Sequence, residues 1–208
     1  SDKNARAAEL AAISGHPLYT FTKENEALTD LLAQFRASRD KSVLAKIREV
    51  AIHYAKKGDL LYPHLKVKYG VSGPSDVMWT VDDEIRDELG ALAKEEQHGE
   101  EWNARLDAVL KRAEEMIYKE QNILFPICAI HFTENEWFSI YRDSKDYAQC
   151  FNVANEEWKD AEAAVIEKQL PIDGEIVMPG GHMTVEQLTA LLNTIPLEIS
   201  FIDADNIN

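Results

Sequence analysis

The feature that most constrains the fold is an internal repeat at an offset of 63 residues. Residues 53–63 (HYAKKGDLLYP) and 116–126 (MIYKEQNILFP) share a lysine, two aliphatic residues, an aromatic residue and a closing proline in the same order. A repeat of this kind indicates one structural unit used twice. We therefore expect two similar helix pairs related by a pseudo-twofold axis; the alternative is that two helices simply end alike. The repeat predicts four equivalent central positions: Tyr19, Gly58, Asp82 and Gln121.

Apolar residues recur at helical spacing in four long segments of the chain. The first is expected to start at Gly15-His16-Pro17, since proline suits the first helical turn. The second should run from about Ser42 towards Leu65, the third should begin near Ser75 as its N-cap, and the fourth should follow residues 97–99. Four amphipathic helices with short connections predict an all-α protein, an antiparallel up-down-up-down four-helix bundle.

The remainder of the chain changes character after the fourth helix. Thr133-Glu134-Asn135-Glu136 has the pattern of a capping box and predicts a shorter helix through Ile140. Prolines and glycines then interrupt residues 171–181, residues 184–192 predict a short amphipathic helix, and residues 197–202 alternate as a strand. One strand cannot bury its own faces, so we interpret it as the beginning of a further domain. The alternative is the edge strand of a hairpin with residues 174–178.

Composition excludes several classes of function. The 208 residues are 45% hydrophobic and 28% charged, with a formal net charge of −15. Such a chain can bury a core, but its surface repels phosphate backbones, so nucleic acid is not an expected partner. We find no apolar run long enough for a membrane span and no signal peptide, and we expect a cytoplasmic protein. Cys128 and Cys150 lack C-x-x-C spacing, and we expect free buried thiols, with a disulfide as the less favoured alternative.

Three segments of the chain resemble a known family. They are HPLYTFTKENEAL at residue 16, HYAKKGDLLYPHLKVKYGVSGPSDVMWTVDDEIR at residue 53, and MIYKEQNILFP at residue 116. They are similar to the hemerythrin-like (HHE cation-binding) domain of bacterial and archaeal proteins in which a PAS domain follows the bundle. The stretch TVEQLTALLNTIPLEISFIDADN resembles the start of that PAS domain. The resemblance implies a bundle over 14–145, a linker or extension over 146–183 and a truncated PAS domain over 184–208.

The resemblance implies a non-haem iron site with histidines and carboxylates from all four helices. The family pattern has histidine, glutamate, histidine and glutamate at four positions where this chain has other residues. Those residues are Tyr19, Gly58, Asp82 and Gln121, the same four that the repeat places at equivalent points. Glycine offers no ligand and glutamine is a poor one. We therefore expect the standard di-iron site to be missing.

Two candidate sites follow from the residues that remain. His16 and His53, the remaining histidines of the pattern, form with Asp82 a two-histidine, one-carboxylate set for one metal ion. Alternatively, Tyr19, Asp82 and Gln121 form a polar network beside the space left by Gly58, which a neighbour such as Tyr19, water or a ligand fills. A haem on His16 or His53 is the least favoured option. We interpret four nearby acids as surface charge: Glu24, Asp83, Glu84 and Glu120.

Three functions are consistent with these sites. The first is a regulatory or sensory module of a PAS-containing protein that has lost the di-iron ligands. The second is an iron-binding sensor of oxygen, nitric oxide or redox state that uses a rearranged ligand set. The third, an oxidase or peroxide-handling enzyme, is the least favoured. The core could bind iron or be free of metal, and the sequence is consistent with both. The expected partner is the adjoining PAS domain. A homodimer is also consistent with the sequence.

Overall fold

The computed structural model describes residues 2–169, 175–178 and 181–194 and is mostly helical, as predicted. Its helices and strands run in the following order: α1 Lys3–Ala11, α2 Pro17–Ser38, α3 Lys41–Ile47, α4 Val50–Leu60, the π-helix η1 His64–Lys68, α5 Gly73–Lys94, α6 Glu100–Lys119, the π-helix η2 Glu120–Leu124, α7 Phe125–His131, α8 Glu134–Ser144, α9 Lys159–Gln169, β1 Glu175–Met178, β2 Gly181–Thr184 and α10 Val185–Thr194. Within these residues no helix is both long enough and apolar enough to cross a membrane.

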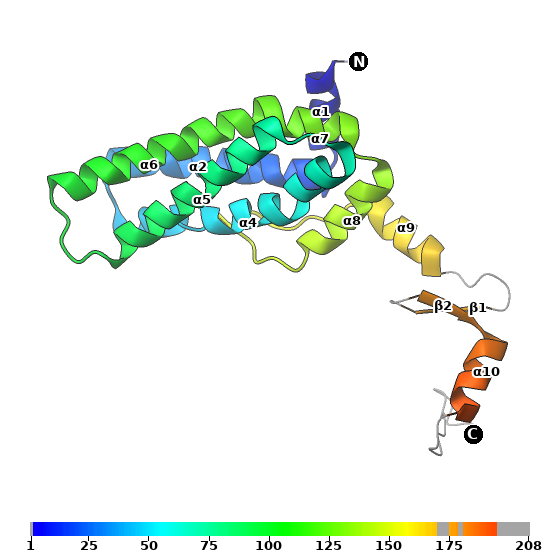
Figure 1. Ribbon diagram of the computed structural model, residues 1–208. Coiled ribbons are helices and arrows are strands. Elements are labelled where there is room, and N and C mark those ends of the chain that lie inside the picture. The colour runs from blue at the N-terminus through cyan, green and yellow to red at the C-terminus, as the bar shows by residue number, and fades with distance from the viewer. Residues whose placement is uncertain (1, 170–174, 179–180, 195–208) are drawn as a thin grey trace. The chain divides into compact units, whose positions relative to one another are not determined.

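Four helices, α2, α4, α5 and α6, form the body of the molecule (Figure 1). Helix α2 contacts α4 and α6, and α5 contacts the same two helices. The contacts therefore close a ring of four helices around a shared interior. Buried leucine, isoleucine, valine, phenylalanine and methionine side chains from all four fill that interior.

The first predicted helix start is confirmed, whereas the second helix is interrupted. Pro17 opens α2, and the His16 side chain accepts a hydrogen bond from the Leu18 amide as its N-cap. Arg39 ends α2 in the left-handed conformation, with φ of 53°. The segment expected as one helix from Ser42 towards Leu65 is divided into α3, α4 and the π-helix η1. π-Helical turns inside helices are uncommon and often mark functional sites.

Two predicted helix starts have different outcomes. Ser75 does not cap α5, because the helix begins earlier, with Ser72 at its N-cap position. The Ser75 hydroxyl instead donates to the Val71 carbonyl at 3.0 Å, a local bond that polar side chains in the first turn commonly make. The capping box at Thr133 and Glu136 is confirmed at the start of α8, where each side chain bonds to the other residue's backbone.

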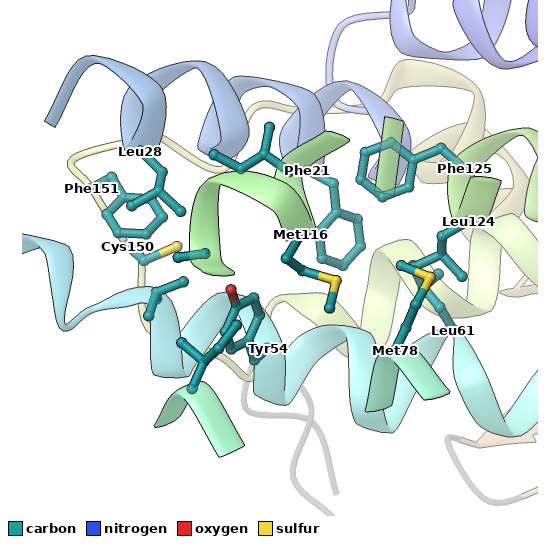
Figure 2. Close-up of a cluster of buried hydrophobic side chains, with 14 of the residues drawn as sticks. Phe21, Leu28, Tyr54, Leu61, Met78, Met116, Leu124, Phe125, Cys150 and Phe151 are labelled. Carbon is teal, nitrogen blue, oxygen red and sulfur yellow. The ribbon is translucent and has the colours of Figure 1, made fainter. Parts of the chain in front are cut away.

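The interior contains an apolar cluster to which residues beyond the four helices contribute (Figure 2). Phe21 and Leu28 of α2 lie with Met78 of α5 and Met116 of α6 in this cluster. Cys150 and Phe151 belong to the same core, although they follow α8 by several residues. Both cysteines are free and buried, as predicted. The segment after α8 therefore contributes side chains to the core.

The chain divides into two compact units, residues 1–161 and residues 162–208. The first unit extends beyond the predicted range 14–145 at both ends, because α1 packs on α2 and α7 and because Trp158 is buried. In the second unit β1 and β2 form an antiparallel hairpin in which Glu175 pairs with Thr184. The helix predicted over 184–192 is α10. The predicted strand at 197–202 lies outside the described residues.

Candidate functional site

The centre of the four helices contains a buried ammonium group. Lys57 on α4 is completely buried, and its Nζ atom donates to Oδ1 of Asp82 on α5 at 2.9 Å. The same ammonium also pairs with Oε1 of Glu120, the first residue of η2. A buried charge costs several kcal/mol unless opposite charges and hydrogen bonds compensate it. Two carboxylates from two other elements provide that compensation here.

Glu120 joins three polar groups from two helices. Besides Lys57, its Oε2 atom accepts from Nδ2 of Asn25 on α2 at 2.7 Å and lies 2.8 Å from Nε2 of His53 on α4. The other ring nitrogen of His53, Nδ1, lies 2.6 Å from Oε2 of Glu24. Ionised carboxylates only accept hydrogen bonds, so both nitrogens of His53 must donate. This geometry requires the imidazolium form of His53.

The network is balanced in charge. Glu24 on α2 pairs with the Lys56 ammonium in addition to His53. The acidic members are Glu24, Asp82 and Glu120, and the basic members are His53, Lys56 and Lys57. All six are buried, and together they connect α2, α4, α5 and η2. With every group ionised, the three negative charges equal the three positive ones.

The pKa shifts agree with this arrangement. Burial alone would lower the pKa of His53, but the carboxylates of Glu120 and Glu24 outweigh burial and raise it. Burial alone would raise the pKa of Glu120, but Lys57 and His53 lower it to about 2. The pKa of Glu24 is also lowered, because His53 and Lys56 outweigh its burial. For Asp82, burial and the charge of Glu120 prevail over Lys57 and raise the pKa.

Aromatic side chains line the network. The Lys57 ammonium lies 4.5 Å from the ring centroid of Tyr54, within cation–π range. The Tyr62 hydroxyl donates to Oδ2 of Asp82 at 2.8 Å, and its ring stacks on Trp79. The hydroxyl of Tyr54 is buried and has no hydrogen-bond partner among the described residues. The rings therefore exclude water from the ammonium and strengthen its electrostatic contacts.

His16 does not contact His53 or Asp82. Its Nδ1 atom accepts from the Leu18 amide at 3.0 Å, and its ring lies between Trp137 at 4.7 Å and Trp158 at 4.6 Å. Burial, with the charge of Arg6, lowers the pKa of His16 to about 3. His16 is therefore a neutral capping residue. The structure does not assemble the predicted set of His16, His53 and Asp82, because each takes part in different contacts.

The structure does not bring together the predicted polar network of Tyr19, Asp82 and Gln121, which was to form a central pocket beside Gly58. Gln121 is exposed, since adjacent residues of a helix point about 100° apart and Glu120 takes the inward direction. Tyr19 is half-buried, and its hydroxyl donates to Glu156 at 3.0 Å instead of to Asp82. Gly58 is buried, but its neighbour is Trp79: a Cβ atom there would lie 3.4 Å from the Trp79 Nε1 atom.

Two of the four acids assigned to the surface lie in the core. Asp83 and Glu84 pair with exposed arginines, as expected of surface charge, whereas Glu24 and Glu120 are almost fully buried. The four-residue spacing of His53 and Lys57 was the sequence signal from which these two buried acids could have been predicted. Residues four apart share one face of a helix, so a histidine and a lysine that share the face of buried Tyr54 and Leu61 predict buried acidic partners.

An iron centre does not fit the donor atoms as they are arranged. Lys57 holds Asp82 and Glu120 together, and both ring nitrogens of His53 are directed at carboxylates. An ammonium offers no lone pair to a metal while it is charged, and a histidine ligand must be unprotonated on one nitrogen. Among the residues that the structure describes, no group of three or more histidine, cysteine, aspartate or glutamate side chains is placed to hold a metal ion.

The fold and the site define a helical protein whose interior carries buried histidine and carboxylate side chains from several helices. The family model for the Hemerythrin HHE cation binding domain matches residues 16–128, more than half of the chain. The chain belongs to this family. No curated protein matches it. The matched range runs from the N-cap of α2 into α7 and contains every member of the charge network.

Proposed function

We propose that this chain is a regulatory or sensory module of the hemerythrin type, an up-down-up-down four-helix bundle whose centre is held by Lys57 instead of iron. One observation carries the proposal: the Lys57 ammonium lies between Asp82 and Glu120, carboxylates of the kind that would otherwise bind a cation. The protein's own cation thus balances the buried acids. We propose a non-catalytic role for the chain. The family to which it belongs is described by a cation-binding domain.

The segment after α8 provides a connection between this centre and the rest of the chain. Its Glu156 carboxylate accepts from Tyr19 of α2, and its Phe151 amide donates to Glu49 at 2.6 Å. Cys150 in the same segment is buried, and burial and the Glu24 carboxylate raise the pKa of its thiol. A change in the charge network would therefore act on the segment that leads into α9. The downstream partner that we propose is the PAS domain predicted over 184–208.

Metal analysis tests the metal-free centre. The protein is purified from iron-supplemented cells, and its iron content and near-ultraviolet absorption are measured. We expect far less than one iron per chain, no charge-transfer band, and a fully folded protein. Near-stoichiometric iron with such a band would instead support the iron-binding sensor, in which Lys57 gives way to a metal.

A matched pair of variants sharpens the test. Lys57→Glu replaces the ammonium with a further carboxylate beside Glu120, Asp82 and His53, whereas Lys57→Met removes the charge without adding a ligand. We expect iron(II) or zinc to raise the melting temperature of Lys57→Glu but not that of Lys57→Met or the parent, because ligands bound only by the folded state stabilise it. Equal stabilisation of the parent by metal would contradict the proposal.

A further inference from the structure

A second polar site lies where the turn between α2 and α3 meets the connection between α5 and α6. A cavity of about 530 Å³ opens there, within the range of small-molecule sites. Phe35 and Leu44 form part of its apolar wall, and Arg39, Lys41 and Arg48 add positive charge. None of these residues belongs to the charge network around Lys57. The site therefore goes beyond the proposed function and does not depend on it.

Arg48 is the most informative residue of this cavity. Its Nε atom is buried and has no hydrogen-bond partner among the described residues. A guanidinium donor removed from water without an acceptor costs free energy. The position therefore favours an acceptor that the residues described by the structure do not supply.

The other charges of the cavity leave this positive character in place. Arg39 is held by Asp107 and by Oδ1 of Asn103 at 2.9 Å. The acid Glu95 is held by Arg105 at 2.7 Å, and Arg105 also pairs with Glu88 at 2.8 Å. The cavity lining as a whole contains three cations and two acids, Glu95 and Glu96, of which Glu96 is exposed. The balance favours a negatively charged ligand.

A flat ring system forms a further part of the wall. The imidazole of His98 stacks on the indole of Trp102, with ring centroids 3.9 Å apart and an angle of 17° between the planes. The Trp102 Nε1 atom donates to the Leu92 carbonyl at 3.1 Å, which fixes the indole. Trp102 is buried while His98 is exposed. The outer face of His98 is therefore open to a planar group, and aromatic stacking adds about 0.5–1.5 kcal/mol to a contact of this kind.

The geometry points to a binding site for a small anion that carries a planar aromatic ring. Arg48 and Lys41 bind the carboxylate or phosphate, and His98 stacks on the ring. Guanidinium groups match both kinds of anion with paired hydrogen bonds. Such a ligand would contact α3 on one side and the α5–α6 connection on the other. It would thus link the two predicted helix pairs at the end where their turns meet.

Calorimetric titration of the full chain with four probes tests this site. Benzoate and adenosine 5′-monophosphate each combine a ring with an anion, one as carboxylate and one as phosphate, and benzyl alcohol and adenosine are the matched neutral compounds. We expect at least one anionic probe to bind and both neutral probes to bind at least about tenfold more weakly, as expected when a charged hydrogen bond is lost. The anion that binds identifies the ligand as a carboxylate or a phosphate.

Variants locate the binding. Arg48→Gln should weaken the binding of the anionic probe by at least about tenfold. His98→Ala should weaken the binding of the same probe by about threefold to tenfold. Lys111→Gln, which removes an equal charge from an exposed position of α6 outside the cavity, should change nothing. If Arg48→Gln does not fold, Lys41→Gln carries the same test, because Lys41 is exposed. The proposal would be overturned if neither anionic probe bound. It would also be overturned if the cavity variants bound the anionic probe as tightly as Lys111→Gln does.

Discussion

Lys57 on α4 and Glu120 at the start of η2 are related by the 63-residue offset of the sequence repeat and form an ion pair with each other in the core. Their exposed fractions are 0% and 1%, so water contributes almost nothing to their solvation. Equivalent positions that carry opposite charges neutralise one another at the centre of the fold. Asp82 on α5 and His53 on α4 also contact this pair, Asp82 through Lys57 and His53 through Glu120.

Removal of the Lys57 charge should strongly destabilise the protein. Lys57→Met leaves Asp82 and Glu120 buried without their cation, and breaking a buried ion pair from one side costs roughly 3–5 kcal/mol. Chemical denaturation measures the loss. Lys111→Met, at an exposed position of α6, should change the free energy of unfolding by less than about 0.5 kcal/mol. The double variant Lys57→Met/Glu120→Gln should lose less than the sum of its single variants, and strict additivity would argue against a coupled pair.

His53 should be an imidazolium at neutral pH. Nitrogen NMR of the histidine ring should show protons on both nitrogens at pH 7, since both lie within 2.8 Å of carboxylate oxygens. The raised pKa has a defined effect on stability. Because the folded chain holds the proton more tightly than the unfolded chain, stability from His53 is complete below the ordinary value of 6.5 and is lost as pH rises through the folded pKa.

The acidic side of the pH profile depends on Glu120. Its pKa of about 2, lowered from 4.5, means that its contribution is complete above pH 4.5 and is lost as pH falls towards 2. Glu24 acts in the same direction.

Unfolding followed by circular dichroism from pH 2 to pH 9 measures both sides of the profile. His53→Gln should abolish the decline above pH 6.5, and an unchanged decline in this variant would contradict the assignment to His53.

The sequence predicted the helical class and several helix ends, because these depend on local chemistry. Pro17 and the capping box at Thr133 act within one helical turn, and both were located correctly. The centre of the fold was not predicted, because it depends on which of two adjacent side chains faces inward. Glu120 and Gln121 are neighbours, yet one is buried and the other exposed. The family pattern pointed to Gln121 as the central residue, whereas the buried ion pair with Lys57 is made by Glu120.

Gly58 should accept a methyl group. A Cβ atom at this position would lie at ordinary contact distance, 3.4 Å, from the Trp79 Nε1 atom, and the helical interior of α4 favours alanine over glycine by about 1 kcal/mol. Gly58→Ala should therefore raise the free energy of unfolding by up to about 1 kcal/mol. Gly90→Ala on α5, with open space around its Cβ position, is the matched control and should show a similar gain. If Gly58→Ala lowers the free energy of unfolding while Gly90→Ala does not, the Trp79 side chain cannot move enough to accommodate the added methyl group.

His16 should stabilise the protein as a cap and as a core ring. His16→Asn keeps an acceptor for the Leu18 amide but leaves space between Trp137 and Trp158. His16→Ala removes both contributions, and the lost cap alone should cost about 0.5–2 kcal/mol. We therefore expect Asn to be less destabilising than Ala in thermal unfolding. Equal effects would show that the cap contributes nothing.

We propose that a lysine ammonium, not a metal ion, occupies the middle of this hemerythrin-type fold. The most direct test is a crystal structure of protein from iron-supplemented cells, with anomalous diffraction recorded at the iron absorption edge. The prediction is an anomalous map without a peak in the core, with Nζ of Lys57 about 2.9 Å from Oδ1 of Asp82. A strong anomalous peak among Glu24, His53 and Glu120, with the Lys57 side chain displaced, would contradict it.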